Sequence, residues 1–296
     1  MSRLEATFAR LHASGRSGLI TYVTAGDPDL PRSRDILLAL ARGGADVIEV
    51  GVPFSDPIAD GPAIQRASER ALAAGSHLGA ALDLVESVRG ELDTPIVLFT
   101  YLNPVLRMGV TACGARLRTA GVDGVLLLDL PIEEAAELPV RDLGDVDPIF
   151  LVSPTTTERR LREAGRVGRG FLYAISRLGV TGARSAVADT ARPLVERIRA
   201  ATSLPVALGF GVSNPEQVAE VGAYADAVVV GSALVQRIAD AAAAGQDVPA
   251  AAEQFVRWLK GDPGDPGSKD PGLRTADPGL RAAGAELRGG SAAGRR

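Results

Sequence analysis

Residues 19–50 read LITYVTAGDPDLPRSRDILLALARGGADVIEV, and they contain the repeating unit of the fold. Two short runs rich in Val, Ile and Leu, Leu19 to Val23 and Asp46 to Val50, flank an amphipathic segment from Pro31 to Arg42. Two apolar strands separated by an amphipathic helix are typical of a β–α–β unit, in which helices cover a parallel sheet. The stretch therefore predicts parallel strands.

The same alternation continues to about residue 260. Eight β–α units close into a barrel, so the sequence predicts an α/β fold, a TIM (β/α)8 barrel with additional helices. A doubly wound sheet is the alternative, but AGDPDL after the first run lacks the expected glycine-rich fingerprint. The long gap after the second run predicts an extra helix starting near Pro62. The eight runs are Leu19 to Val23, Asp46 to Val50, Ile96 to Tyr101, Gly124 to Leu130, Pro148 to Val152, Phe171 to Ile175, Pro205 to Phe210 and Ala227 to Val230.

The composition is that of a protein with a full hydrophobic core. Of 296 residues, 46% are hydrophobic and 23% are charged, which excludes the disordered, collagen-like and membrane classes. No apolar stretch approaches the roughly 18 residues of a membrane helix. A net charge of -4 argues against nucleic acid as the main partner. A single cysteine, Cys113, excludes an internal disulfide, and the N-terminal segment lacks the pattern of a signal peptide. We expect a cytoplasmic protein.

The C-terminal segment differs from the rest of the chain. Residues 261–296 are rich in Gly and Pro and contain no Val, Ile or aromatic residue. Such a segment buries too little apolar surface to offset its ordering entropy. We expect residues 1–260 to form a single TIM-barrel catalytic domain and residues 261–296 to form a disordered tail.

Lysine and histidine are scarce, and their positions limit the chemistry. The only lysines are Lys260 and Lys269, and the only histidines are His12 and His77, none of them in an apolar run. Chemistry inside the barrel therefore has no lysine Schiff base, no pyridoxal phosphate attached to this chain and no histidine-ligated metal. Carboxylates, hydroxyls and backbone amides remain.

The second run contains a carboxylate that is expected to point into the barrel. Alternation places Val47, Glu49 and Gly51 on one face and Ile48 and Val50 on the other. If the latter two pack against helices, Glu49 points into the barrel mouth, where an unpaired carboxylate tends to hold its proton. Such a group is a candidate general acid or base. The alternative is a structural ion pair, although none of the eight runs contains Arg or Lys.

Two aspartates, Asp56 and Asp60, follow in the next loop. Taken alone, an aspartate before a helix is most often an N-cap. Their position after Glu49 favours a catalytic role, because two carboxylates in different surroundings can divide the work. One exchanges protons, and the other stays ionised to stabilise positive charge.

Glycine-rich turns follow the last two runs, at Gly209 to Ser213 and Gly231 to Ala233, and a helix is expected after each, near Asn214 and Leu234. Loops after strands seven and eight are the usual phosphate site of a TIM barrel, because backbone amides at helix starts attract anions. Simple β–α turns are the alternative. Residues 176–185, SRLGVTGARS, have the glycines of a mobile lid or of a plain surface loop.

Several motifs together resemble the tryptophan synthase α subunit family over residues Ser2 to Lys260. The most specific is EVGVPFSDPIADGPAIQ at 49–65. Five shorter motifs support it: TAGDP at 24–28, TYLNP at 100–104, DLP at 129–131, SRLGVTGARS at 176–185 and GFGVSNPEQV at 209–218. The resemblance implies a TIM-barrel lyase. Its reaction is the retro-aldol cleavage of indole-3-glycerol phosphate to indole and glyceraldehyde 3-phosphate in tryptophan biosynthesis, without a metal or organic cofactor.

The resemblance also implies roles for individual residues. Glu49 corresponds to the catalytic proton-transfer residue, and Asp60 to the carboxylate that binds the indole N–H and stabilises the positive indolenine. Gly182, Gly211, Gly231 and Ser232 would bind phosphate. The residues that would shape the substrate pocket are Tyr22, Tyr101, Leu126, Tyr173, Thr181 and Phe210. Three positions depart from the family pattern: Tyr22 stands where Phe is expected, and Arg184-Ser185 replaces Glu-Asn in the lid.

Family members assemble with a β subunit that carries pyridoxal phosphate and receives indole through a tunnel. The resemblance therefore implies an α2β2 heterotetramer whose contact loops are Pro53 to Asp60 and Leu102 to Arg107. The implied contact residues are Pro53, Asp56, Asn103 and Pro104. Three alternatives remain: a phosphate-binding isomerase barrel, a lyase that releases indole without any β subunit, and a regulatory subunit that is catalytically weak.

Overall fold

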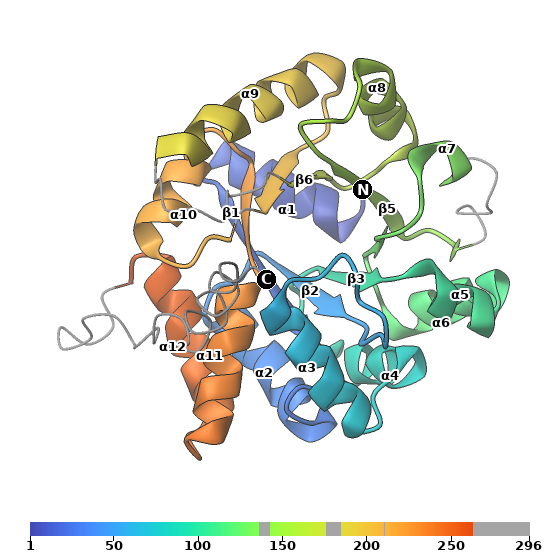
Figure 1. Cartoon of the computed structure of the whole chain (residues 1–296), viewed down its shortest axis with the longest axis vertical. Helices are drawn as coiled ribbons and strands as arrows, with labels where there is room; N and C mark the ends of the chain where they lie inside the picture. The colour runs from blue at the N-terminus through green and yellow to red at the C-terminus, as the bar shows by residue number, and fades with distance from the viewer. Residues whose placement is uncertain (136–142, 176–184, 210, 263–296) are drawn as a thin grey trace, which may run out of the picture. The chain divides into compact units, whose positions relative to one another are not determined.

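The computed structural model describes residues 1–135, 143–175, 185–209 and 211–262. Within them, eight parallel strands pair in sequence order, and β8 pairs with β1 to close the barrel (Figure 1). The TIM-barrel prediction is therefore confirmed. The strands are β1 (Gly18–Thr24), β2 (Val47–Gly51), β3 (Ile96–Thr100), β4 (Gly124–Leu127), β5 (Asp147–Val152), β6 (Leu172–Ile175), β7 (Val206–Gly209) and β8 (Ala227–Val230).

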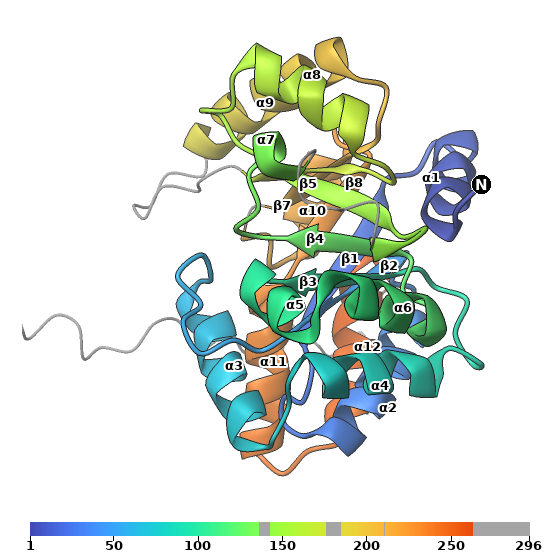
Figure 2. The same cartoon turned by 90° about the vertical axis from the view of Figure 1, so that its right-hand side faces the viewer.

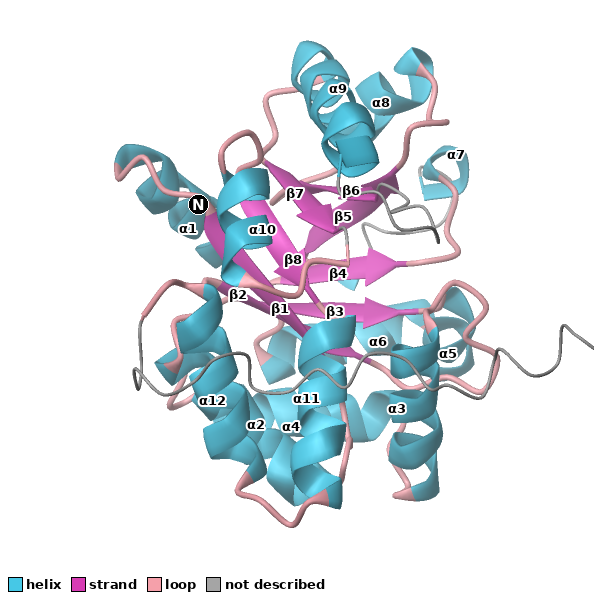
Figure 3. Ribbon diagram, turned by 60° about the vertical axis from the view of Figure 1, so that its left-hand side comes forward, coloured by secondary structure: helices cyan, strands magenta, loops and turns pink. Residues whose placement is uncertain are grey.

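Helices surround the strands (Figure 3), and several are additional to the eight-fold repeat. The extra helix expected at Pro62 is present, whereas the helix expected near Leu234 begins earlier, at Ser232, because Gly231 is its N-cap. The helices are α1 (Arg3–Ala13), α2 (Leu30–Arg42), α3 (Pro62–Ala73), α4 (Leu78–Val88), α5 (Leu102–Met108), α6 (Val110–Ala120), α7 (Ile132–Ala135), α8 (Glu158–Val167), α9 (Ser185–Ala201), α10 (Pro215–Gly222), α11 (Ser232–Ala243) and α12 (Val248–Leu259).

The core has two layers because strand residues alternate between the two faces of the sheet. Outward residues such as Ile48 and Val50 pack under the helices. Inward residues such as Val47 fill the barrel together with Leu4 and Phe8 of α1. Helix α1 therefore closes the end of the barrel at which the strands begin, and the opposite end is left for loops (Figure 2).

Three aspartates, Asp46, Asp123 and Asp226, pin the strands at this closed end. Each lies just before one strand and accepts a backbone N–H at or near the start of a neighbouring strand. The donors are Leu19, Ile96 and Val206, at 2.9, 2.8 and 2.8 Å respectively. A buried carboxylate that accepts such bonds and faces a cation is well compensated. Their cationic partners are Lys260 for the first, Arg3 and Arg89 for the second, and Arg199 for the third.

The described residues up to Asp262 belong to one compact unit. None of the helices described is both long and apolar enough to cross a membrane. Residues 263–296, which form most of the expected tail, lie outside the described part of the chain.

Candidate active site

Glu49 lies inside the barrel near the carboxyl end of β2. Its side chain is fully buried, and the inward position of Val47 two residues earlier confirms the alternation expected from the sequence. In the strand register Glu49 lies opposite Tyr22 of β1 and Val97 of β3. The acid therefore faces the catalytic end of a TIM barrel rather than the helices.

The surroundings of Glu49 favour its protonated form. Neither carboxylate oxygen has a hydrogen-bond partner among the described residues, so no ion pair with an arginine is found there. Burial raises the pKa of Glu49 to about 8, because removal from water penalises the charged form. At neutral pH most molecules carry the proton, which makes this side chain a proton donor.

Asp60 lies in the loop between β2 and α3, and it is only partly buried. The capping alternative is wrong for Asp60, because the N-cap of α3 is Gly61 and no side chain caps that end. Asp56 is exposed and accepts a 2.6 Å hydrogen bond from the Ser55 hydroxyl instead of capping a helix. Burial raises the pKa of Asp60 to about 6, and a hydrogen bond from Tyr101 opposes that rise. Asp60 is therefore mostly ionised at neutral pH, whereas Glu49 is mostly protonated.

Tyr22 and Tyr173 lie near these acids. Burial raises the pKa of Tyr22, and the charges of Asp60 and Glu49 raise it further. Burial also raises the pKa of Tyr173, with a further contribution from Glu49. The Tyr22 hydroxyl lies 3.4 Å from Thr24 Oγ1, and a Cβ atom built on Gly51 would lie only 2.1 Å from the Tyr22 hydroxyl oxygen. Gly51 is therefore required by the position of the Tyr22 ring.

One side chain that the sequence analysis did not single out holds the Asp60 loop in place. The amide nitrogen of Gln65 donates to the carbonyl oxygens of Asp60, at 3.0 Å, and Pro57, at 3.3 Å. A second anchor is the bidentate pair between Arg70 of α3 and the buried Asp27, at 2.8 and 2.9 Å. Gln65 belongs to the motif at 49–65, but its residue type alone does not identify what it binds.

The turn after β8 leaves a helix start open. Gly231 is the N-cap of α11, and no side chain caps this helix, so its first backbone amides have no side-chain acceptor at the N-cap. Ser232 is exposed, and its hydroxyl oxygen lies 4.0 Å from a Cβ atom built on Gly61, so the Asp60 loop approaches this turn. Gly211 is exposed and has a positive φ of 68°. The helix that follows, α10, is capped by Asn214.

Three of the expected site residues, Thr181, Gly182 and Phe210, lie outside the described residues, as does the lid segment 176–184. Leu126 is fully buried in the inner core. A hollow of about 350 Å³ opens at the carboxyl ends of β4, β5 and β6, beside Asp129 and Ser153. The described residues contain no cluster of His, Cys, Asp and Glu that could hold a metal ion.

Pro53 and Asp56 lie in the loop that contains Asp60, whereas the second expected contact loop, Leu102 to Arg107, is wrong as a loop because these residues form helix α5. Asp56 and Asn103 are exposed, Pro104 is partly buried and Pro53 is buried. Two large apolar side chains are exposed in these segments, Ile58 at 90% in the loop and Leu106 at 50% on α5. Exposed large apolar side chains are typical of protein-binding surfaces.

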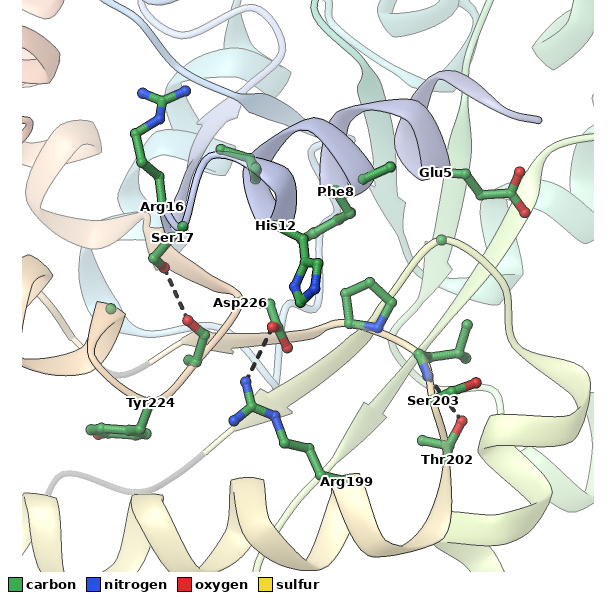
Figure 4. A pocket seen from close by; sticks show the side chains of 18 of the residues that line it. Glu5, Phe8, His12, Arg16, Ser17, Arg199, Thr202, Ser203, Tyr224 and Asp226 are labelled. Carbon is green, nitrogen blue, oxygen red and sulfur yellow. Dashed lines mark hydrogen bonds and ion pairs between the residues drawn. The ribbon is translucent and has the colours of Figure 1, made fainter.

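A larger hollow, of about 880 Å³, lies at the closed end of the barrel beside α1 (Figure 4), and neither Glu49 nor Asp60 lines it. Its lining includes His12 of α1 together with Arg199 and Asp226, which form an ion pair at 3.1 Å. Since the Asp226 carboxylate also accepts the N–H of Val206, these groups support the barrel. At the opposite end, Glu49 and Asp60 have no such cationic partner in the described residues, which makes that end the candidate site.

Comparison with known protein families is decisive. The family model described as tryptophan synthase alpha chain matches residues 8–261. The chain belongs to the tryptophan synthase alpha chain family. A tryptophan synthase alpha chain from Geotalea uraniireducens is 52% identical over 237 residues, which cover 80% of this chain and 89% of that protein. The alpha chain from Solibacter usitatus is 47% identical over 261 residues, which cover 88% and 97%.

Solved structures of alpha chains have the same fold. The tryptophan synthase alpha subunit of Legionella pneumophila superimposes with a TM-score of 0.82 at 35% identity, covering 88% of this chain and 98% of that chain. A chain of the tryptophan synthase α2β2 complex from Pyrococcus furiosus gives a TM-score of 0.76 at 42% identity, covering 82% and 98%. Family membership therefore rests on sequence and structure together.

Proposed function

We propose that this chain is the lyase subunit of a tryptophan synthase and that Glu49 and Asp60 are its catalytic residues. The substrate is indole-3-glycerol phosphate, and the products are indole and glyceraldehyde 3-phosphate. The observation that carries the assignment of roles is the difference between the two acids. Glu49 is fully buried without a partner and has a raised pKa of about 8, whereas Asp60 has a pKa of about 6.

Glu49 supplies and recovers one proton. In its protonated form it donates that proton to C3 of the indole ring, which converts the ring into a positively charged indolenine. The resulting carboxylate is a strong base in a dry site, and it removes the proton from the glycerol hydroxyl next to the ring. The carbon–carbon bond then breaks, its electrons return to the indole ring, and the hydroxyl-bearing carbon becomes the aldehyde.

Asp60 stabilises the positive charge that this proton transfer creates. Its carboxylate accepts a hydrogen bond from the indole N–H. The attraction is strongest in the indolenine, where the ring is cationic. Because the stabilisation is larger in the intermediate than in the substrate, it lowers the barrier rather than merely strengthening binding.

The open start of α11 suits the phosphate group of the substrate. Gly231, Ser232 and Gly211 supply backbone amides near a helix N-terminus, where anions are favoured. Gly182 and the lid residue Thr181 complete the proposed phosphate and substrate contacts. The proposed pocket walls are Tyr22, Tyr101, Leu126, Tyr173 and Phe210.

The partner is the β subunit of tryptophan synthase in an α2β2 heterotetramer, which docks on the segments that expose Ile58 and Leu106. The alpha chain has no cofactor of its own, and pyridoxal phosphate belongs to the β subunit. We propose a cytoplasmic location, a catalytic domain of residues 1–260 and a disordered tail of residues 261–296.

Two substitutions test the catalytic roles. Glu49→Gln keeps the size of the side chain but cannot exchange a proton, so indole formation should fall by about 10² to 10⁴. Asp60→Asn removes the charge that stabilises the indolenine and should reduce kcat by about 10². Indole release by the purified variants is measured with and without the β subunit, and Glu196→Gln, an exposed position on α9, is the control. Near wild-type turnover in folded Glu49→Gln would rule out the proposed chemistry.

A further inference from the structure

Tyr101 joins two loops at the catalytic end of the barrel. It follows β3 directly and is the N-cap of α5, so its backbone is held by the barrel on one side and by a helix on the other. Its side chain is only 4% exposed and reaches across to the loop between β2 and α3. Tyr101 therefore connects α5, through its backbone, to the loop between β2 and α3, through its side chain.

The side chain of Tyr101 contacts that loop at three points. The backbone N–H of Ala59 donates to the Tyr101 hydroxyl oxygen at 3.0 Å, and the hydroxyl donates to Asp60 Oδ2 at 3.4 Å. The ring stacks on Phe54, with ring centroids 4.8 Å apart and an interplanar angle of 26°. Because the Ala59 N–H occupies one acceptor site, the single hydroxyl proton remains available for the Asp60 carboxylate.

The other side of Tyr101 leads to the surface. The next residue, Leu102, donates its backbone N–H to Asp129 Oδ1 at 2.7 Å, which fixes the start of α5. Leu106 on α5 and Ile58 on the Asp60 loop are both exposed apolar side chains. A protein that covers these two side chains therefore presses on both segments that meet at Tyr101.

We propose that Tyr101 is a positioning residue that orients Asp60 and transmits docking of the partner protein on α5 and the 53–60 loop to that carboxylate. The inference rests on the proposed function, because it requires Asp60 to act on the substrate. It assigns Tyr101 a role beyond that of a pocket wall.

The hydrogen-bond geometry explains how docking acts. At 3.4 Å the bond from Tyr101 to Asp60 is longer than the 2.5–3.0 Å that is usual for O–H···O bonds, so it is weak before docking. On this proposal, docking on α5 shortens the bond into that range. Two phenols interact with Asp60 in the described residues: the Tyr101 hydroxyl at the end of β3 by a hydrogen bond, and Tyr22 of β1 electrostatically. Of the two, only the Tyr101 hydroxyl makes a hydrogen bond to the Asp60 carboxylate in the described residues.

Tyr101→Phe tests the proposal, since it keeps the ring that stacks on Phe54 and removes only the hydroxyl. We measure kcat and KM for indole-3-glycerol phosphate from pH 5 to 9, with the α chain alone and with saturating β subunit. A hydrogen bond to a charged group corresponds to at least about a tenfold change. We expect kcat of the complex to fall about tenfold, with less than a twofold change in KM.

Two further readouts separate positioning from a structural effect. Loss of a bond that favours the ionised form raises the pKa of Asp60, so the acidic limb of the kcat profile should move to higher pH. The factor by which the β subunit stimulates kcat should also fall. Tyr224→Phe is the control, because this buried tyrosine lines the hollow at the closed end and should leave both readouts unchanged.

The outcomes distinguish the two proposals. If Glu49→Gln and Asp60→Asn abolish indole formation but Tyr101→Phe keeps the wild-type kcat, acidic limb and stimulation factor, the positioning role is overturned and the lyase function stands. If Glu49→Gln and Asp60→Asn stay active, the lyase mechanism itself is wrong. Thermal melting checks that Tyr101→Phe is folded. If it is not, Phe54→Leu, which removes the stacking and keeps the hydroxyl, is judged by the same three readouts.

Discussion

Glu49 and Asp60 have surroundings opposite to those of three aspartates at the closed end of the barrel. At the closed end, Asp46, Asp123 and Asp226 each accept a backbone N–H and each face a lysine or arginine. At the catalytic end, Glu49 has no partner in the described residues, and Asp60 has only the 3.4 Å bond from Tyr101 on its carboxylate. Compensated carboxylates stabilise a fold, whereas uncompensated ones have shifted pKa values and can exchange protons.

The contrast shows that one sheet can support both stability and catalysis. Strand starts are held by ion pairs that span from helices and termini to the sheet. At the strand ends Asp27 is paired with Arg70, whereas Glu49 has no partner and Asp60 has only the bond from Tyr101 on its carboxylate in the described residues. In TIM barrels generally, the face where strands begin is associated with stability and the face where they end with catalysis. Substitutions at the two ends should therefore separate stability from activity.

The largest effect on stability is expected at Asp123. It is 8% exposed, accepts the N–H of Ile96 and pairs with Arg3 and Arg89. Asp123→Ala leaves the half-buried Arg89 without this carboxylate and should destabilise the fold by about 3–5 kcal/mol. Chemical denaturation measures the loss, and kcat below the transition should stay near wild type. A large drop in kcat of the folded variant would contradict the division between the two ends.

Glu49→Gln should have the opposite effect on stability. The folded protein holds the Glu49 proton up to about pH 8, whereas the unfolded chain loses it above about pH 4.5. Stability of the wild type therefore falls as pH rises through this window, and the glutamine variant escapes that loss. At pH 7 the variant should be more stable by roughly 3 kcal/mol, because one pKa unit corresponds to about 1.4 kcal/mol.

Denaturation of both proteins at pH 5, 6, 7 and 8 measures this difference. The advantage of Glu49→Gln should shrink towards pH 5, because that pH is close to the ordinary glutamyl pKa of 4.5 and ionisation in the unfolded chain then contributes little free energy. An advantage that does not depend on pH would show that the Glu49 carboxyl is not held in its neutral form.

Gly51→Ala should produce an intermediate effect at the catalytic end. The added methyl group would meet the Tyr22 ring at 2.1–2.7 Å, and the strand and the ring must shift to relieve the overlap. Overpacking of this kind costs about 1–3 kcal/mol, and because Tyr22 lies beside Glu49 in the register, activity should fall as well. Melting temperature and indole release are measured together. Unchanged values for both would place the Tyr22 ring elsewhere.

The smallest effect is expected for Arg199→Ala at the closed end. Arg199 and Asp226 are 48% and 33% exposed, and Asp226 keeps its bond to the N–H of Val206. Solvent screens such a pair, so the substitution should cost less than about 1 kcal/mol. Denaturation midpoints at low and high salt give the measurement. A loss of stability as large as that of Asp123→Ala would show that the greater exposure of the Arg199–Asp226 pair does not weaken it relative to the ion pairs of Asp123.

Local patterns in the sequence were sufficient for the fold and for the direction of Glu49. Eight apolar runs separated by amphipathic segments define eight β–α units, and the two-residue period of a strand puts Glu49 on the face opposite Ile48 and Val50. Both properties depend on neighbours in the chain. The roles of Glu49 and Asp60 came from the same motif, through its resemblance to a family.

Only the tertiary structure decided which groups surround those acids. The hydroxyl that reaches Asp60 belongs to Tyr101, 41 residues further along the chain, and the glycine that the Tyr22 ring requires lies on a different strand. Residue spacing contains no information on such contacts, because strand register and loop paths bring them together. The missing partner of Glu49 and the shifted pKa values of both acids follow from this packing, since they depend on burial and on neighbours that are distant in sequence.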